Sequence, residues 1–203
     1  WRWVFIVLFG FAGLLLAWVF WRLPETLQPE DRRPLSFSAI GAMLSHYLSY
    51  RAGVGYTIGT TCVMASLMAY LTSSQQVYVD TYGLGAKFPL ALGAVAISVG
   101  LAAIVNANLV RRFGMRRLSH SAIIAFAVIN AANAVYLSMT GGGTVAGYMT
   151  FLIAAYFMMG LINANFSAIV MEPMGRMAGT ASAVYGFITT TGSALLGGMA
   201  GRL

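Results

Sequence analysis

Charged residues are scarce in this chain. Of its 203 residues, 8% are charged and 59% are hydrophobic. Soluble domains carry about 25% charged residues, which keep their surfaces hydrated. The composition therefore excludes a soluble globular protein and predicts an integral membrane protein made of α-helices.

Cysteine and histidine are also rare. The single cysteine, Cys62, lies in an apolar run and has no partner for a disulfide or a thiolate metal site. Neither His46 nor His120 has a second ligand at metal-site spacing. No histidine or carboxylate falls at membrane depth beside a serine, as an intramembrane hydrolase would need. We therefore expect no catalytic residue, no metal and no cofactor.

Charge is absent from the interior of the long apolar runs. Six runs are each long enough to cross a bilayer, at about 4–21, 52–72, 88–107, 119–139, 145–170 and 178–200. Charged groups inside a membrane usually mark proton relays and ion paths. This segment therefore supplies no obvious proton carrier.

The basic residues gather in short loops. The segment from Asn106 to Leu118 holds four arginines, at 111, 112, 116 and 117, between two apolar runs. Short loops rich in arginine remain on the cytoplasmic side. Loops on that side would hold nine basic residues, and the other side only Arg2, Lys87 and Arg202. The net charge of +7 therefore indicates topology and contact with lipid headgroups, and we expect no nucleic-acid partner.

Three regions follow from this pattern. Residues 1–23 form one membrane helix, and residues 24–51 form a cytoplasmic connection. That connection contains a polar linker, 24–34, and an amphipathic helix at 36–50 that could lie on the membrane surface. Residues 52–203 form a bundle of five further helices, with an outer loop at 73–87.

The polar side chains within the spans allow two readings. Thr57, Thr61, Met64 and Met68 recur at helical spacing, which suits either adaptable ligand contacts or ordinary helix packing. Asparagines near or inside the spans could join helices or contact a substrate; they are Asn106, Asn108, Asn130, Asn133, Asn163 and Asn165. The last span carries small residues at four-residue intervals, a pattern that predicts close helix packing: Ser182, Gly186, Thr190, Ala194 and Gly198.

Several motifs resemble those of a known family. The hairpin from Arg112 to Arg117 resembles the second copy of the basic loop motif of the major facilitator superfamily, although Arg111 replaces the usual aspartate. Further segments resemble the Bcr/CflA branch of drug:proton antiporters over nearly the whole chain; they are Trp1–Phe5, Leu23–Leu27, Asn108–Gly114, Asn163–Asn165, Glu172–Pro173 and Ala178–Ala183. The resemblance implies that the six spans are the family's helices six to eleven. The chain would then be mainly the C-terminal half of a longer protein.

The resemblance also implies a function and a site. It implies proton-coupled export of small amphipathic or cationic compounds by alternating access, in the bacterial inner membrane. A missing N-terminal half would carry the coupling proton. The family's helices seven and ten line the cavity, which gives as substrate-binding candidates Thr57, Thr61, Met64, Met68, Tyr156, Met159 and Asn163. Arg112, Arg116 and Glu172 would form cytoplasmic contacts that stabilise one access state.

Two alternatives remain open at this point. The same fold could serve a narrow-specificity metabolite transporter, because a few pocket side chains decide the substrate. The chain could also be a non-transporting membrane scaffold or half-size subunit that pairs through the small-residue face of its last span. Five further apolar spans encoded upstream would favour the transporter.

Overall fold

The structure is a computed structural model that describes residues 2–24 and 37–201. It is all-helical in these ranges, as lipid requires, because a helix satisfies its own backbone hydrogen bonds. The chain divides into two compact units, Trp1–Phe37 and Ser38–Leu203. The first contains α1 (Arg2–Arg22), whose side chains are nearly all exposed and apolar, as on a helix that faces lipid.

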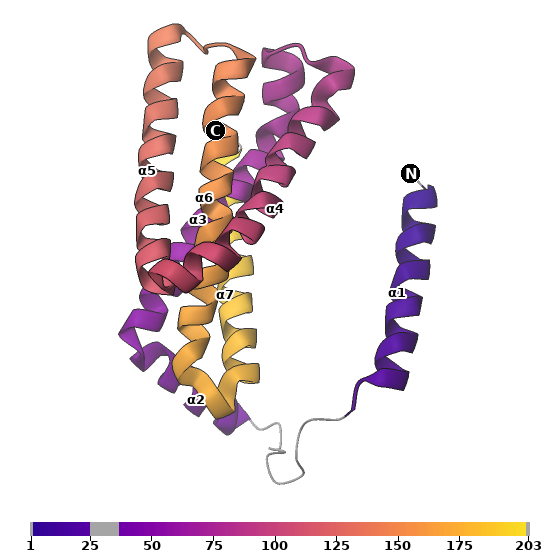
Figure 1. Cartoon of the computed structure of the whole chain (residues 1–203), viewed down its shortest axis with the longest axis vertical. Helices are drawn as coiled ribbons and strands as arrows, with labels where there is room; N and C mark the ends of the chain where they lie inside the picture. Colours follow the sequence, from indigo (N-terminus) through magenta and orange to yellow (C-terminus); the bar gives the residue numbers. More distant parts are fainter. Residues whose placement is uncertain (1, 25–36, 202–203) are drawn as a thin grey trace. The chain divides into compact units, whose positions relative to one another are not determined.

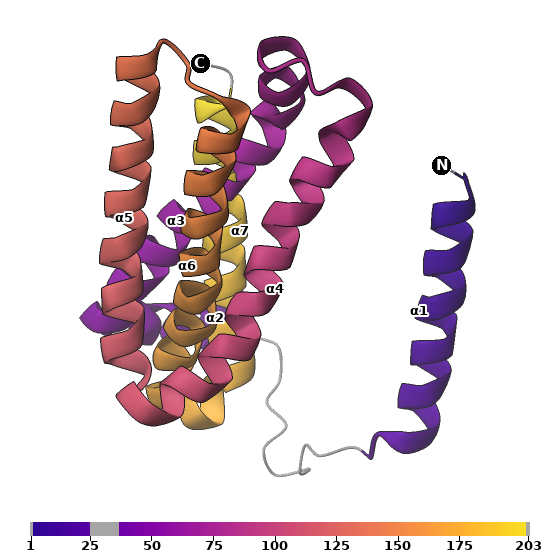
Figure 2. The same ribbon diagram turned by 45° about the horizontal axis from the view of Figure 1, so that its top comes forward.

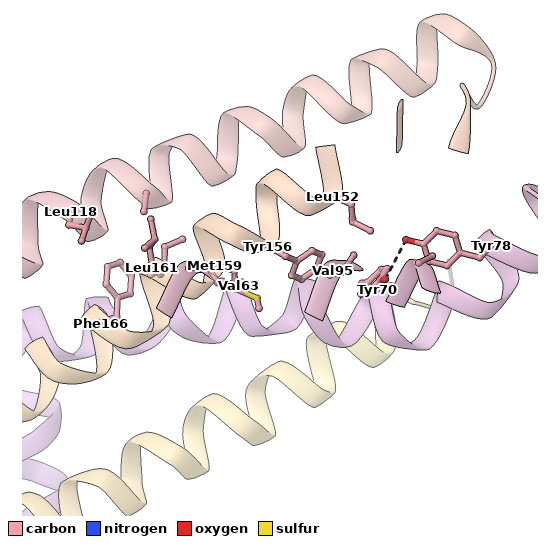
Figure 3. Packing of buried hydrophobic residues seen from close by; sticks show 14 residues of the cluster. Val63, Tyr70, Tyr78, Val95, Leu118, Leu152, Tyr156, Met159, Leu161 and Phe166 are labelled. Atoms are coloured by element: carbon pink, nitrogen blue, oxygen red, sulfur yellow. Dashed lines mark hydrogen bonds between the residues drawn. The ribbon is translucent and has the colours of Figure 1, made fainter. Parts of the chain in front are cut away.

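The second unit is a bundle of long helices (Figures 1 and 2). It begins with the short α2 (Phe37–Ser49), and its long members are α3 (Arg51–Gln75), α4 (Phe88–Phe113), α5 (Met115–Thr140), α6 (Val145–Met171) and α7 (Ala178–Ala200). α6 packs against α5, α4 and α3, and α7 lies along α3. The core between α3, α4, α5 and α6 includes Val63, Val95, Leu118, Ile162 and Phe166 (Figure 3).

Most of the predicted spans are confirmed. Five stretches of the described residues are long and apolar enough to cross a membrane, namely Arg2–Arg22, Arg51–Thr81, Gly85–Phe113, Met115–Thr140 and Val145–Gly175. The sixth prediction corresponds to α7, a helix of 23 residues that does not belong to this group. It contains many threonines, serines and glycines, and it packs along α3.

The predicted loop at 73–87 is wrong in part. α3 continues to Gln75 and is followed by a π-helical turn, η2 (Gln76–Thr81), and a 3-10 turn, η3 (Gly85–Lys87). Polar residues indicate where a helix leaves the hydrocarbon region of the membrane. The helix itself can continue beyond that point, as α3 does. Within η2, Tyr78 is fully buried and its hydroxyl donates to Sδ of Met149, which ties this turn to α6.

The two ends of the bundle match the predicted topology. The arginine-rich hairpin is a tight reversal at Gly114, whose φ of 77° is strained for a residue with a Cβ. Nη2 of Arg116 lies 3.7 Å from Oε2 of Glu172, which begins the 3-10 turn η4 (Glu172–Met177). At the other end, the Tyr82 hydroxyl donates to the Gly142 carbonyl at 2.7 Å. The hairpin and η4 therefore lie at one end, and the turns that contain Tyr82 and Gly142 lie at the other.

The small residues that bring α7 against α3 are not those of the predicted stripe. Gly192, Gly197 and Gly201 are the residues of α7 and its end that approach α3. Within the described part of the chain, open space faces Gly186 and Gly198, two members of the predicted stripe. Because an α-helix has 3.6 residues per turn, residues spaced by four lie at successively rotated positions around its axis. A run of small residues at this spacing therefore does not identify the face that contacts another helix.

The α3–α7 contact predicts opposite effects for two neighbouring glycines. A Cβ at Gly197 would lie 2.5 Å from the Ala65 carbonyl oxygen and against Met68. We expect Gly197→Ala to lower the melting temperature of the full-length protein in detergent. Gly198→Ala is the matched control, since its Cβ meets open space and alanine favours a helix by about 1 kcal/mol. Equal or higher thermal stability of Gly197→Ala would contradict this packing.

Candidate functional site

A pocket of about 350 Å³ lies between α3, α6 and α7. Most of its surface is apolar, although many of its uncharged lining residues carry a polar group; they are Thr60, Met64, Met68, Asn163, Ser167, Tyr185, Thr189, Thr190, Ser193 and Ala194. Thr60, Thr189 and Ser193 are buried at its floor, whereas Thr190 and Ala194 are exposed at its rim. The pocket can therefore hold a small molecule without offering it a charged partner.

Three of the seven predicted substrate-binding residues line this pocket. Met64 and Met68 come from α3, and Asn163 comes from α6. Oδ1 of Asn163 is buried and has no hydrogen-bond partner within the described part of the chain. An unpaired buried acceptor costs about 1–3 kcal/mol, so this oxygen destabilises the bundle unless the side chain rearranges.

The two predicted threonines lie outside the pocket. Thr57 donates to the Gly53 carbonyl at 2.7 Å, so the Tyr47 hydroxyl must donate to Thr57 across their 2.5 Å contact. Burial raises the pKa of the Tyr47 phenol, which stays protonated and ties α2 to α3. Thr61 donates to the Thr57 carbonyl, and its methyl group faces Gly192 of α7. Both threonines therefore join helices.

Tyr156 and Met159 also lie outside the pocket. Both are nearly fully buried in the core between α6 and its neighbours (Figure 3). The Tyr156 hydroxyl donates to the Ser66 carbonyl at 3.1 Å, and its ring lies 5.2 Å from that of Tyr70. These contacts hold α6 against α3 and leave no surface for a ligand in this structure.

The sequence prediction missed the contribution of α7. Tyr185, Thr189 and Ser193 follow one another at four-residue intervals and line the pocket. The predicted small-residue stripe starts three positions earlier, at Ser182, and runs beside them. The repeated hydroxyl residues are the feature of the sequence that indicates this face of α7, and residue size does not reveal it.

The predicted cytoplasmic residues take two different arrangements. Arg116 is within ion-pair distance of Glu172, as described above, and both side chains are largely exposed. Arg112 does not join them, since its guanidinium carbon lies 5.4 Å from the centre of the Phe113 ring. The pair connects the start of α5 to the connection between α6 and α7.

The asparagines take different arrangements, and one pair of them joins two helices. Nδ2 of Asn165 donates to Oδ1 of Asn106 at 2.6 Å, which joins α6 to α4. Asn130 donates to a carbonyl of its own helix, and Asn108 accepts from Arg111. Asn163 is the asparagine that lines the pocket.

The Major Facilitator Superfamily profile matches residues 1–197 of this chain. The chain belongs to this superfamily. It is 30% identical over 195 residues to the uncharacterized MFS-type transporter YdgK of Bacillus subtilis, a match that covers 93% of the chain and 46% of that protein. It is 24% identical over 203 residues to a bicyclomycin resistance protein homolog of Haemophilus influenzae, covering 98% of the chain and 50% of that protein. No solved structure matches the chain significantly.

Membership explains the composition and the helices. The chain spans about half the length of the curated relatives it matches. Members of the superfamily are membrane transporters. Its apolar helices and these relatives make it part of a multi-pass protein of the bacterial inner membrane.

The pocket predicts which side chains of this transporter can be reached from water. In a full-length Cys62→Ser background, Met68→Cys and Thr190→Cys should react with a water-soluble maleimide, because both positions line the pocket and neither is buried. Met159→Cys is the matched control and should react at least about tenfold more slowly, since Met159 is 2% exposed. Faster labelling at position 159 than at 68 would show that the pocket lies elsewhere.

Proposed function

We propose that this chain is mainly the C-terminal half of a Bcr/CflA-type drug:proton antiporter that exports small amphipathic or cationic compounds by alternating access. The observation that carries the proposal is the uncharged, methionine-containing pocket between α3, α6 and α7. A bicyclomycin resistance protein homolog among its relatives supports drug export as the direction and purpose of transport. The basic hairpin supports the C-terminal assignment, and the half-length match to both relatives fits one half of a transporter.

The pocket suits ligands of varied shape. Met64 and Met68 offer flexible thioether side chains that adapt to irregular apolar surfaces. Hydroxyl and amide groups on α6 and α7 add hydrogen-bonding positions on the opposite side. Promiscuous binding sites commonly combine these two properties. The second half of the transporter would complete the site and move against this bundle around it.

We propose that the group that binds the coupling proton belongs to the N-terminal half of the transporter. In the described residues the carboxylates are Asp80 and Glu172, which lie at opposite ends of the bundle and do not line the pocket. Neither is at a depth where a proton relay would operate. Proton coupling therefore requires a titratable group from another part of the transporter.

Transport by the full-length protein tests this proposal. Reconstituted vesicles with an acidic lumen should accumulate ethidium as protons leave, and nigericin should abolish the accumulation by removing the pH gradient. Met64→Ala and Asn163→Ala should each reduce the initial rate by about threefold or more, because each removes pocket contacts. The exposed Met139 provides the matched control Met139→Ala. Export that ignores the gradient would contradict antiport, and unchanged export by both pocket variants would remove these residues from the site.

The Arg116–Glu172 pair is proposed to stabilise one access state. Arg116→Glu and Glu172→Arg should each shift the inward/outward population, and the charge-swapped double variant should restore it. Because exposed ion pairs are weak, we expect changes of less than about fivefold, measured by spin-label distances across the cytoplasmic ends of the two halves. Arg117→Glu changes the net charge equally at the neighbouring exposed position and is the control. An unchanged population in both single variants would remove the pair from gating.

A further inference from the structure

A second pocket, of about 310 Å³, lies between the last turns of α4 and the first turns of α5. Leu109 and Phe113 line it from α4, and Arg117, Leu118 and Ser121 line it from α5. The two helices meet at the arginine-rich hairpin and diverge away from it (Figures 1 and 2). The pocket therefore lies at the hairpin end of the bundle and shares no residue with the pocket between α3, α6 and α7.

The polarity of this pocket changes with depth. Phe113 and Arg117 lie next to the hairpin, whereas Leu109 and Ser121 lie one helical turn, about 6 Å, further along their helices. Leu118 is the most buried residue of the lining. The Ser121 hydroxyl donates to the Leu118 carbonyl at 2.9 Å, so its proton is used within α5 and requires no acceptor from a ligand. One end of the pocket thus offers a cation, and the other end offers mainly apolar surface.

Arg117 differs from the other three arginines of the hairpin in having no partner for its side chain. Each of the others contacts a side chain, which is Asn108 for Arg111, the Phe113 ring for Arg112 and Glu172 for Arg116. Among the residues that the structure describes, none forms a hydrogen bond or an ion pair with the Arg117 guanidinium, and this side chain is exposed. Its charge is therefore available to a ligand that enters the pocket.

We propose that this pocket binds an anionic phospholipid of the cytoplasmic leaflet. The lipid phosphate would pair with the Arg117 guanidinium, and an acyl chain would follow Leu118 and Leu109 toward the hydrocarbon region. A basic residue at the membrane surface attracts anionic headgroups, so the charges are complementary. A soluble phosphate would satisfy the guanidinium and leave the apolar surface uncovered, whereas one lipid molecule matches both ends of the pocket. The inference does not depend on drug export or on proton coupling.

Native mass spectrometry of the full-length protein with three probes tests this inference. The probes are phosphatidylglycerol and phosphatidylcholine with identical oleoyl chains, and glycerol 3-phosphate, which has the phosphate without the chains. The first lipid bound should show about fivefold tighter apparent binding for phosphatidylglycerol than for phosphatidylcholine, as expected for one basic residue acting on an anionic headgroup. An excess of glycerol 3-phosphate of about a hundredfold should not displace phosphatidylglycerol, because it makes no apolar contact.

Matched variants connect the preference to the pocket. In Arg117→Gln, the preference for phosphatidylglycerol should fall below about twofold. Arg111→Gln removes the same charge from the same hairpin and should keep the full preference, since the Arg111 side chain contacts Asn108 and does not line the pocket. In detergent without phospholipid, both variants should have the melting temperature of the wild-type protein, because both side chains are exposed. Substitution of Arg117 should therefore act only where phospholipid is present.

Four outcomes would overturn the inference. Equal binding of the two lipids by the wild-type protein would show that the pocket does not select an anionic headgroup. A preference that survives Arg117→Gln would place the lipid elsewhere, and an equal loss in Arg111→Gln would show attraction to the charge of the hairpin as a whole. Displacement of phosphatidylglycerol by glycerol 3-phosphate would show a site for free phosphate. Each of these results would leave proton-driven ethidium export unaffected as a test of the proposed function.

Discussion

The absence of water within the hydrocarbon region is the constraint on which this structure depends. A polar group at that depth must find its partner inside the protein, since an unpaired group costs several kcal/mol. Backbone groups meet this requirement by forming helices, and hydroxyl side chains meet it by donating to carbonyls of their own helix, as Thr57, Thr61 and Thr189 do. The Asn165 amide makes both kinds of contact, since it donates to the Leu161 carbonyl of its own helix and to Oδ1 of Asn106 on α4.

The same constraint explains how the helices associate. Burial of apolar surface does not drive helices together in lipid, where contact area and hydrogen bonds decide. The α3–α7 contact depends on glycines that bring α7 against Ala65 and Met68 of α3. The α3–α6 contact depends on a large residue instead, because the Tyr156 hydroxyl reaches the Ser66 carbonyl. The pocket lies where neither kind of contact closes the space between these three helices.

The sequence was sufficient for the features that hydropathy and charge control. The apolar runs, the hairpin at Gly114 and the common end of Arg116 and Glu172 follow from the costs of placing charge in lipid. The sequence did not predict how each helix is rotated about its own axis. Thr57 and Met64 lie on one predicted stripe, yet Thr57 faces α2 and Met64 lines the pocket, because α2 covers only one end of α3. Tyr156 and Met159 could not be assigned to core or cavity from sequence, since both positions suit either.

The distribution of charge along the bundle suggests how such a transporter could separate substrate binding from proton coupling. In the described residues the charged side chains lie at the ends of the helices, and the pocket between them is neutral. A neutral wall keeps a constant hydrogen-bonding character whether or not a proton is bound elsewhere, so substrate contacts here need not change when the coupling group titrates. Under the proposed function, coupling would then act through the relative position of the two halves, and this half would contribute shape and uncharged hydrogen-bonding groups. That division allows the substrate range to change by single substitutions on α7 without disturbing the group that carries the proton.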